Sequence, residues 1–249
     1  MKFTNEVAIV TGGAQGIGKE VVKGIVNGGG RVIIVDINEA AAKQTVTELG
    51  EKVAFYKMDL SAPETIREVI ATILKDYKRI DVLVNCAGIV STKKFVDLDD
   101  AEWQKVIQIN LTGTFTTIHA LFPHFIKNKG GRIVNVSSVA GKIGGGLLGT
   151  AAYASSKAGV NGLTKAVAKE GGKYNIHCNA VCPSYTNTTM TTALSEDAEK
   201  KQKVISMIPL GRRAEPVEIA QMILFFASNL ASFVNGEVGD VDGGIVLDG

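Results

Sequence analysis

VAIVTGGAQGIG, at residues 7–18, joins a short β-branched run to a glycine-rich turn and then to a segment with helical periodicity. The glycines have the spacing Gly-x-x-x-Gly-x-Gly. Between a buried strand and a helix, such a turn lets backbone amides and the helix N-terminus approach a diphosphate. An isolated turn of this kind is equally compatible with an ordinary tight connection, so its meaning depends on the residues further along the chain.

The next apolar run, RVIIVD at residues 31–36, ends in a carboxylate. An acidic side chain at the end of a second strand accepts hydrogen bonds from the adenosine ribose hydroxyls and repels a 2′-phosphate. Gln15 and Ile37 add no cation that could pair with such a phosphate. Asp36 therefore favours NAD(H) over NADP(H); the alternative is a solvated acid at a strand end.

Further β-branched runs alternate with stretches of helical periodicity, which is typical of repeated βα units. The runs lie at residues 7–10, 31–36, 53–58, 81–85, 132–136, 175–181 and 236–242. The helical stretches lie at residues 21–29, 40–49, 64–77, 100–126, 151–171 and 216–229. The strands lack polar alternation, as expected where helices cover both faces of a parallel sheet. The sequence predicts an α/β fold: a single-domain, Rossmann-type doubly wound parallel sheet of seven strands.

Length and charge limit the possible partners. The chain has 249 residues, 45% of them apolar, and is expected to form one catalytic domain over residues 1–249. A formal charge of +2 gives no footprint for nucleic acid or a membrane surface, so a small-molecule substrate is expected. No signal peptide is recognised, and three cysteines suit a reducing cytoplasm. Residues 184–211, without a strand pattern and longer than an ordinary connection, are expected to form a substrate flap.

A second group of polar residues begins a predicted helix. YASSK, at residues 153–157, places Tyr153 and Lys157 on one helix face. A neighbouring ammonium stabilises a phenolate, so Lys157 is expected to bring the pKa of Tyr153 from about 10 toward working pH. Such pairs also occur on ordinary helix surfaces. Ser138 favours a functional role for this pair. It follows the strand 132–136 at its carboxyl end, which is where doubly wound sheets bind ligands.

Together these motifs resemble the short-chain dehydrogenase/reductase family over residues 7–244. TGGAQGIG, the pair Asp59-Leu60 and NCAG at residues 85–88 match the family's cofactor motifs, while Ser184 stands where the family usually has glycine. The resemblance, with the strand-end acid, implies NAD as cofactor. The expected cofactor-binding residues are Gly12, Gln15, Gly16, Ile17, Gly18, Asp36, Ile37, Asp59, Leu60, Asn85, Ala87, Gly88, Tyr153, Lys157, Pro183 and Thr188.

The resemblance also implies the catalytic set Asn110, Ser138, Tyr153 and Lys157. In the family, hydride passes between the nicotinamide and a carbonyl carbon while the tyrosine protonates the oxygen. The serine polarises that oxygen, the lysine binds the nicotinamide ribose, and the asparagine holds a water in a proton relay. A homotetramer formed through the predicted long helix is a further implication. No metal is expected, since no cysteine or histidine pair has clustered ligands.

The substrate is less well defined by the sequence. We expect a secondary alcohol or ketone on a small molecule such as a polyol, sugar or hydroxyketone. The alternative is a 3-oxoacyl-(acyl-carrier-protein) reductase, disfavoured by Asp36 and by the length of the loop at residues 139–152. Lys142 is the one cation in this loop, which disfavours a highly anionic substrate unless Arg212 and Arg213 approach from the flap. Such a reductase is expected to show a basic docking patch. Leu147 and Leu148 are expected to form an apolar lip. A non-catalytic NAD(H)-binding scaffold or sensor is the third hypothesis, which the intact catalytic set disfavours.

Overall fold

The computed structural model describes residues 1–146, 149–192 and 196–247. The expected lip residues Leu147 and Leu148 lie outside the described residues. Within the described part of the chain, no helix combines the length and apolar character needed to cross a membrane.

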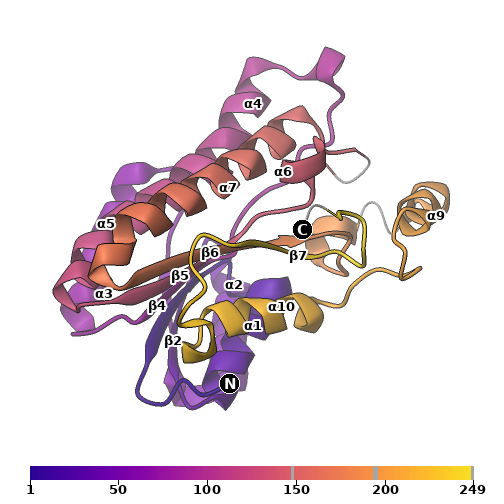
Figure 1. The fold of residues 1–249 in the computed structure, drawn as a ribbon. Helices are drawn as coiled ribbons and strands as arrows, with labels where there is room; N and C mark the ends of the chain where they lie inside the picture. Colours follow the sequence, from indigo (N-terminus) through magenta and orange to yellow (C-terminus); the bar gives the residue numbers. More distant parts are fainter. Residues whose placement is uncertain (147–148, 193–195, 248–249) are drawn as a thin grey trace.

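One parallel sheet forms the centre of the molecule, with the strand order β3-β2-β1-β4-β5-β6-β7 (Figure 1). The strands are β1 (Val7–Thr11), β2 (Arg31–Asp36), β3 (Val53–Lys57), β4 (Val82–Asn85), β5 (Gly131–Val136), β6 (Ile176–Pro183) and β7 (Val238–Val241). The strand order reverses between β1 and β4, and ligands bind beyond the carboxyl ends of the strands at such a switch point. The predicted doubly wound α/β fold is confirmed.

Both faces of the sheet are buried in its central strands, which explains why β1, β2 and β4 are almost entirely apolar. Neighbouring residues of a strand point to opposite faces, yet Ile9 and Val10, like Ile33 and Ile34, are completely buried. Each pair divides between two separate cores, one on either side of the sheet. A polar residue on either face would lose its hydration, so the β-branched runs persist through the central strands.

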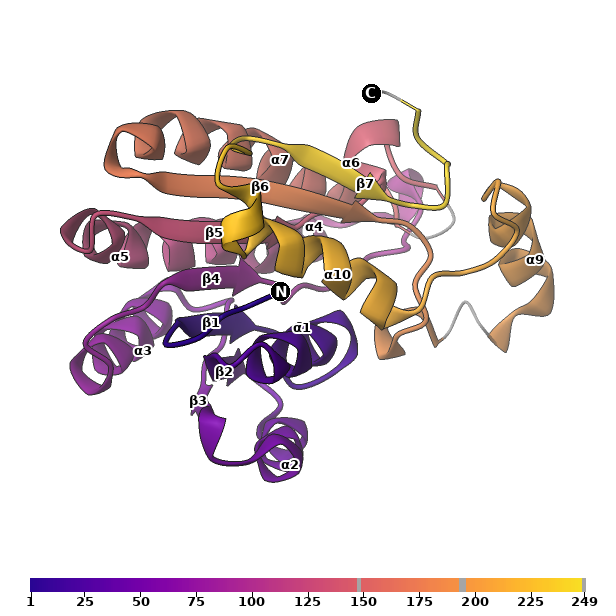
Figure 2. The same cartoon turned by 60° about the horizontal axis from the view of Figure 1, so that its bottom comes forward.

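The helices form two layers (Figure 2). One layer contains α1 (Gly16–Asn27), α2 (Glu39–Leu49) and α10 (Pro216–Phe226), and the other contains α3 (Pro63–Asp76), α5 (Gly113–Lys127) and α7 (Ala151–Gly171). Smaller helices are α4 (Asp100–Ile107), α6 (Ala140–Ile143) and α9 (Ala198–Ser206). Side chains and prolines define several helix starts: Asn38 and Asp99 cap α2 and α4, and Pro216 begins α10.

The predicted long helix at residues 100–126 is interrupted. A π-helical turn, η3 (Gln108–Thr112), separates α4 from α5. Helical periodicity does not reveal such a turn, because one extra residue in the turn leaves the apolar pattern on either side intact. Asn110 lies in this turn, and its side chain bonds to the backbone of Ile89 beyond β4. Through Asn110, the π-helical turn therefore connects this helical layer to the segment that follows the carboxyl end of β4.

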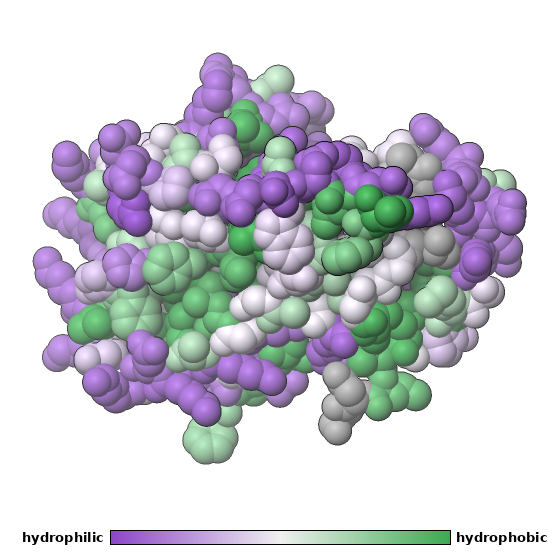
Figure 3. Space-filling view, turned by 90° about the horizontal axis from the view of Figure 1, so that it is seen from above, coloured by the Kyte–Doolittle hydropathy of each residue, from purple (hydrophilic) through white to green (hydrophobic). Residues whose placement is uncertain are grey.

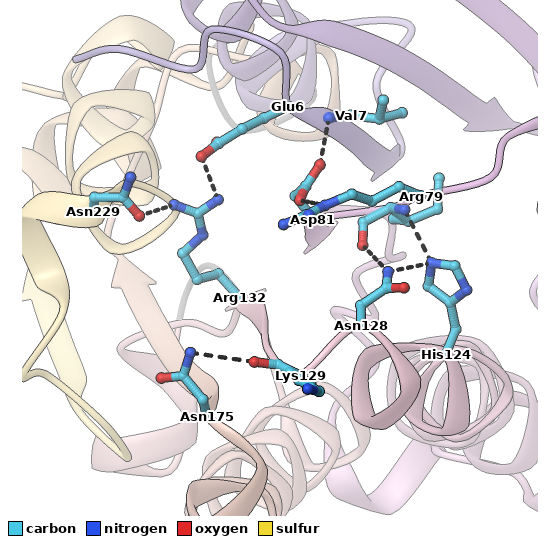
Figure 4. A network of polar contacts seen from close by, with 11 residues as sticks. Glu6, Val7, Arg79, Asp81, His124, Asn128, Lys129, Arg132, Asn175 and Asn229 are labelled. Atoms are coloured by element: carbon cyan, nitrogen blue, oxygen red, sulfur yellow. Dashed lines mark hydrogen bonds and ion pairs between the residues drawn. The ribbon is translucent and has the colours of Figure 1, made fainter.

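Polar side chains join the strands at the opposite, N-terminal edge of the sheet (Figure 4). Arg132 lies 2.8 Å from the carboxylate of Glu6 and donates to Asn229 over 2.7 Å. Asp81 accepts a hydrogen bond of 3.0 Å from the amide of Val7. These contacts connect segments before β1, β4 and β5, and the carboxyl edge of the sheet remains open to a ligand.

Candidate active site

A cavity of about 680 Å³ runs along the carboxyl ends of the strands. Its wall begins at the glycine-rich turn and the end of β2, passes β4 and β5, and ends at the segment after β6. It therefore spans the switch point of the sheet, as the sequence predicts for a ligand site.

Backbone packing explains why two positions of the glycine-rich turn require glycine. Gly12 has a φ of +66°, and a Cβ there would lie 2.8 Å from the backbone of Ala87. A Cβ on Gly18 would lie 2.1 Å from the carbonyl oxygen of Gly12. The turn therefore closes tightly against β4 and leads into α1 at Gly16, whose first amides receive no cap from the Gln15 side chain. This arrangement fits the diphosphate of a dinucleotide.

The acidic end of β2 lies at one end of the cavity. Asp36 accepts a hydrogen bond from the amide of Ala14 over 3.1 Å and another from the amide of Asn38 over 2.9 Å. Each carboxylate oxygen of Asp36 retains acceptor capacity for a further donor. Ile37, beside it, is an exposed apolar residue that also lines the cavity. This end of the cavity fits an adenosine ribose.

Ser138, Tyr153 and Lys157 line the cavity together, and Ser138 hydrogen-bonds with Tyr153. Ser138 follows β5, whereas Tyr153 and Lys157 come from the first turns of α7, which packs beside it. Lys157 is buried, and its Nζ donates to the carbonyl of Val136 over 2.7 Å while lying 5.7 Å from the centre of the Tyr153 ring. Thus the strand end fixes the lysine, and the helix spacing places it beside the phenol.

The pKa of Tyr153 differs in direction from the sequence prediction. Burial raises it, and hydrogen bonding with Ser138 opposes this rise. The expected lowering by Lys157 was wrong for this state of the protein, because the ammonium is directed to the Val136 carbonyl and is itself destabilised by burial. Burial lowers the pKa of Lys157 to about 8. The phenol therefore holds its proton at neutral pH and can act as a proton donor.

Two of the predicted site residues do not line the cavity. Asn110 is buried, accepts from the amide of Ile89 over 2.8 Å, and donates to the Ile89 carbonyl and to Ser156. Asn85 is buried at the end of β4 and donates to Asn135 over 2.8 Å. Both side chains are held by polar partners inside the protein, and the Asn110 amide lies behind Gly88, where a Cβ would lie 3.1 Å from its Oδ1.

All other predicted site residues line the cavity. These are Gly12, Gln15, Gly16, Ile17, Gly18, Asp36, Ile37, Asp59, Leu60, Ala87, Gly88, Ser138, Tyr153, Lys157, Pro183 and Thr188. Thr188 faces the glycine-rich turn, since a Cβ on Gly16 would lie 3.4 Å from its methyl carbon. Ser184 also lines the cavity, and its hydroxyl donates to the carbonyl of Asp242 over 2.9 Å. The serine is therefore accommodated, and it connects this loop to the C-terminal segment.

Sequence reasoning missed an apolar part of the cavity wall. It is formed by Val90, Ile143, Met190, Val204, Met207 and Ile245. These residues come from the segment after β4, from α6, from the region of residues 184–211 and from the C-terminal segment. No sequence motif connects such distant positions, and only the fold brings them together.

The arrangement defines a dinucleotide-dependent oxidoreductase site. A family model described as "Enoyl-(Acyl carrier protein) reductase" matches residues 12–246. The 3-oxoacyl-(acyl-carrier-protein) reductase of Thermotoga maritima is 42% identical, over 99% of this chain and all of that protein. The acetoacetyl-CoA reductase of Shinella zoogloeoides is 40% identical, over 96% of this chain and 98% of that protein.

A solved structure is similar throughout. It is a putative NAD(P)-dependent gluconate 5-dehydrogenase from Beutenbergia cavernae with bound NADP, which is 31% identical with a TM-score of 0.93, and the similarity covers 98% of each chain. This chain belongs to the short-chain dehydrogenase/reductase family. It is an oxidoreductase that acts on CH–OH groups and binds a nicotinamide dinucleotide.

The expectation of a polyol, sugar or hydroxyketone substrate was wrong. Relatives named as reductases of 3-oxoacyl-(acyl-carrier-protein) match nearly the whole chain at up to 42% identity, which favours the alternative that the sequence features had disfavoured. The length of the loop at residues 139–152 was a poor guide to the substrate. The apolar wall comes mainly from other segments, so this loop alone does not define the substrate.

Proposed function

We propose that the protein reduces the 3-oxo group of acyl thioesters carried on acyl carrier protein and forms 3-hydroxyacyl thioesters. The observation that carries this proposal is the meeting of Ser138, Tyr153 and Lys157 in a cavity whose adjoining wall is apolar. The names of the full-length relatives support the same substrate class.

Each catalytic side chain has a defined part in the proposed reduction. When bound, the dihydronicotinamide supplies a hydride for the 3-carbonyl carbon. The Tyr153 hydroxyl gives its proton to the carbonyl oxygen as negative charge develops there, and the Ser138 hydroxyl donates a hydrogen bond to the same oxygen. Lys157 holds a positive charge beside the phenol and is oriented by the Val136 carbonyl. Tyr153 is protonated at neutral pH, as proton donation requires, and hydrogen bonding with Ser138 opposes the rise of its pKa on burial.

NADH is the proposed cofactor because a carboxylate occupies the ribose end of the cavity. A 2′-phosphate at this position would be repelled by Asp36, and the neighbouring Ile37 offers no cation to pair with it. Asn110 and Asn85 are proposed to support the site from behind rather than to touch the cofactor. The segment 184–211 is proposed as the substrate flap of the single domain.

The nature of the carrier is tested separately from the chemistry. Lys93 and Lys142 each follow or precede a cavity-lining residue in the chain, and Arg212 lies before α10; they pair with Asp99, Asp240 and Glu218 respectively. The expected basic docking patch is therefore weakened at these three positions. A cytoplasmic homotetramer remains a prediction, and the free thiols of the three cysteines agree with the compartment.

The experiment measures NADH oxidation by the purified chain with acetoacetyl thioesters of acyl carrier protein and of coenzyme A. Gluconate, sorbitol and acetoin, with the appropriate redox state of the cofactor, serve as comparison substrates. We expect thioester reduction, with a 3-hydroxyacyl product identified by mass spectrometry. Lack of turnover with both thioesters would contradict the proposal, whereas turnover with coenzyme A alone would restrict it to a different carrier.

A further inference from the structure

We propose that Ile143, Met190 and Met207 form a subsite for the distal part of an acyl chain, so that the enzyme prefers a 3-oxodecanoyl group over an acetoacetyl group. This inference rests on the proposed function and adds chain-length selection to it. The three residues belong to no recognised motif, and they lie at the end of α6, in the short helix η5 (Thr189–Thr191) and directly after α9.

Exposure distinguishes these side chains from the protein core. Ile143 is 48% exposed, Met190 44% and Met207 53%, although all three are large and apolar. A single exposed apolar side chain needs no explanation, but here three from separate elements line one cavity. Together they offer apolar surface that a ligand can remove from water.

Three further apolar residues of the cavity wall belong to, or pack on, two apolar clusters, one at Tyr153 and one beside α9. Val90 packs against the cluster that contains Tyr153 and also lines the cavity. Val204 is buried with Tyr185 and Ile208, and Ile245 packs on this second cluster. Because Val90, Val204 and Ile245 line the same cavity as Tyr153, a chain attached to the reacting carbonyl has an apolar surface to follow.

The distribution of charge supports an apolar occupant. Among the described residues that line the cavity, the charged ones are Asp36 and Asp59 at the adenosine end and Lys157 at the catalytic centre. The subsite therefore has neither a cation for an acidic group nor a carboxylate to bind several hydroxyls. The face seen from above in Figure 3, where α4 and α7 lie uppermost in Figure 1, is a different surface, on which apolar residues are interspersed with pale and hydrophilic ones.

The residue types also suit a chain rather than a rigid ring. Methionine side chains are unbranched and adapt to irregular apolar shapes, so Met190 and Met207 can follow a flexible alkyl chain. Four carbons place the acetoacetyl group at the catalytic centre, whereas the additional methylenes of a longer chain can contact the subsite. Each methylene removed from water strengthens binding. The preference should consequently grow with chain length.

The test compares acetoacetyl and 3-oxodecanoyl thioesters of N-acetylcysteamine, which remove the carrier from the measurement. For the full chain with NADH, we expect kcat/KM for the 3-oxodecanoyl compound to exceed that for the acetoacetyl compound by about tenfold or more. Met207→Ser and Ile143→Ser should each lower this ratio about threefold to tenfold, chiefly through KM for the longer substrate. The matched control is Leu230→Ser, since Leu230 is an exposed apolar residue that does not line the cavity. This control should leave the ratio unchanged.

The outcomes separate the inference from the function on which it rests. Equal kcat/KM values for the two chain lengths, or a ratio unaffected by both subsite substitutions, would overturn the subsite while leaving the reductase proposal intact. If neither N-acetylcysteamine thioester is reduced and the thioesters of acyl carrier protein and coenzyme A are not reduced either, the proposed function itself fails. If only the carrier thioesters are reduced, the same two chain lengths are compared on acyl carrier protein. Circular dichroism and thermal unfolding of each variant distinguish loss of the subsite from loss of folding, and a destabilised Met207→Ser variant is replaced by Met207→Gln.

Discussion

At the scale of single residues, burial of the Lys157 ammonium lowers the stability of the native protein, whereas the same ammonium has a proposed role beside the Tyr153 phenol. Burial lowers the pKa of Lys157 from 10.5 to about 8, so between these pH values the unfolded chain holds a proton that the native protein lacks. Native stability should therefore rise with pH across that window. We predict that Lys157→Met raises the free energy of unfolding at pH 7 by roughly 1–3 kcal/mol while reducing turnover at least a hundredfold.

Denaturant unfolding and steady-state kinetics measure both effects of this substitution. Lys165→Met is the control, because Lys165 lies on the same helix but is exposed. It should change neither stability nor turnover appreciably. Lower stability of Lys157→Met at pH 7 would show that the Val136 hydrogen bond outweighs the burial of the ammonium.

Asp36 gives a second prediction at this scale. Asp36→Asn removes the charge but retains an oxygen that can accept the Ala14 amide. We expect the ratio of kcat/KM for NADPH to that for NADH to rise at least tenfold, because repulsion of the 2′-phosphate is lost. Asp59→Asn provides the comparison, since Asp59 also lines the cavity and caps a turn through Ser61. An unchanged ratio in the Asp36 variant would argue against this carboxylate as the selecting group.

At the scale of elements, local sequence predicted the regular parts well. α7 spans residues 151–171 as expected, and all seven strands lie within two residues or so of their predicted positions. In the central strands β1, β2 and β4, continuous burial imposes a nearly continuous apolar run. The π-turn η3 was missed since it preserves the apolar periodicity on both sides. The apolar part of the cavity wall was also missed, because segments that lie far apart in the sequence form it. The motifs predicted residues that line one cavity, among them the glycine-rich turn, Tyr153 and Lys157, but they carried no information on the apolar part of its wall.

The contact between η3 and the segment after β4 gives the prediction for this scale. Asn110→Ala leaves the amide and carbonyl of Ile89 without their side-chain partner. We expect the free energy of unfolding to fall by roughly 1–3 kcal/mol, with turnover lowered because the segment near Lys157 loosens. Ser138→Ala should instead lower turnover with little change in thermal unfolding. Unchanged stability of Asn110→Ala would indicate that this element contact is not structural.

At the scale of the whole molecule, the carboxyl-terminal and N-terminal edges of the sheet contribute to different properties, the first to ligand binding and the second to stability. The carboxyl edge forms the cavity, whereas polar contacts at the N-terminal edge join separate segments (Figure 4). The side chains of Arg132 and Glu6 are only 14% and 16% exposed. We predict that Arg132→Ala lowers the free energy of unfolding by roughly 2 kcal/mol, because a half-buried carboxylate loses its partner, while kcat/KM remains within twofold.

Arg67→Ala is the control for this prediction. Arg67 pairs with Glu64 on the surface, where the two side chains are 44% and 85% exposed, so its removal should change stability by less than about 0.5 kcal/mol. A large loss of activity in Arg132→Ala, measured where the variant remains folded, would mean that the two edges are coupled rather than separate.

Proton donation by Tyr153 to a 3-oxoacyl thioester is the central claim, and the Tyr153→Phe variant tests it most directly. Phenylalanine retains the ring that packs beside Val90 and Ala154 but removes the hydroxyl. With acetoacetyl acyl carrier protein and NADH, we predict a fall in kcat of about a thousandfold or more, with NADH affinity measured by fluorescence changed less than threefold. Reduction at an undiminished rate by the folded variant would contradict the assignment of Tyr153 as the acid.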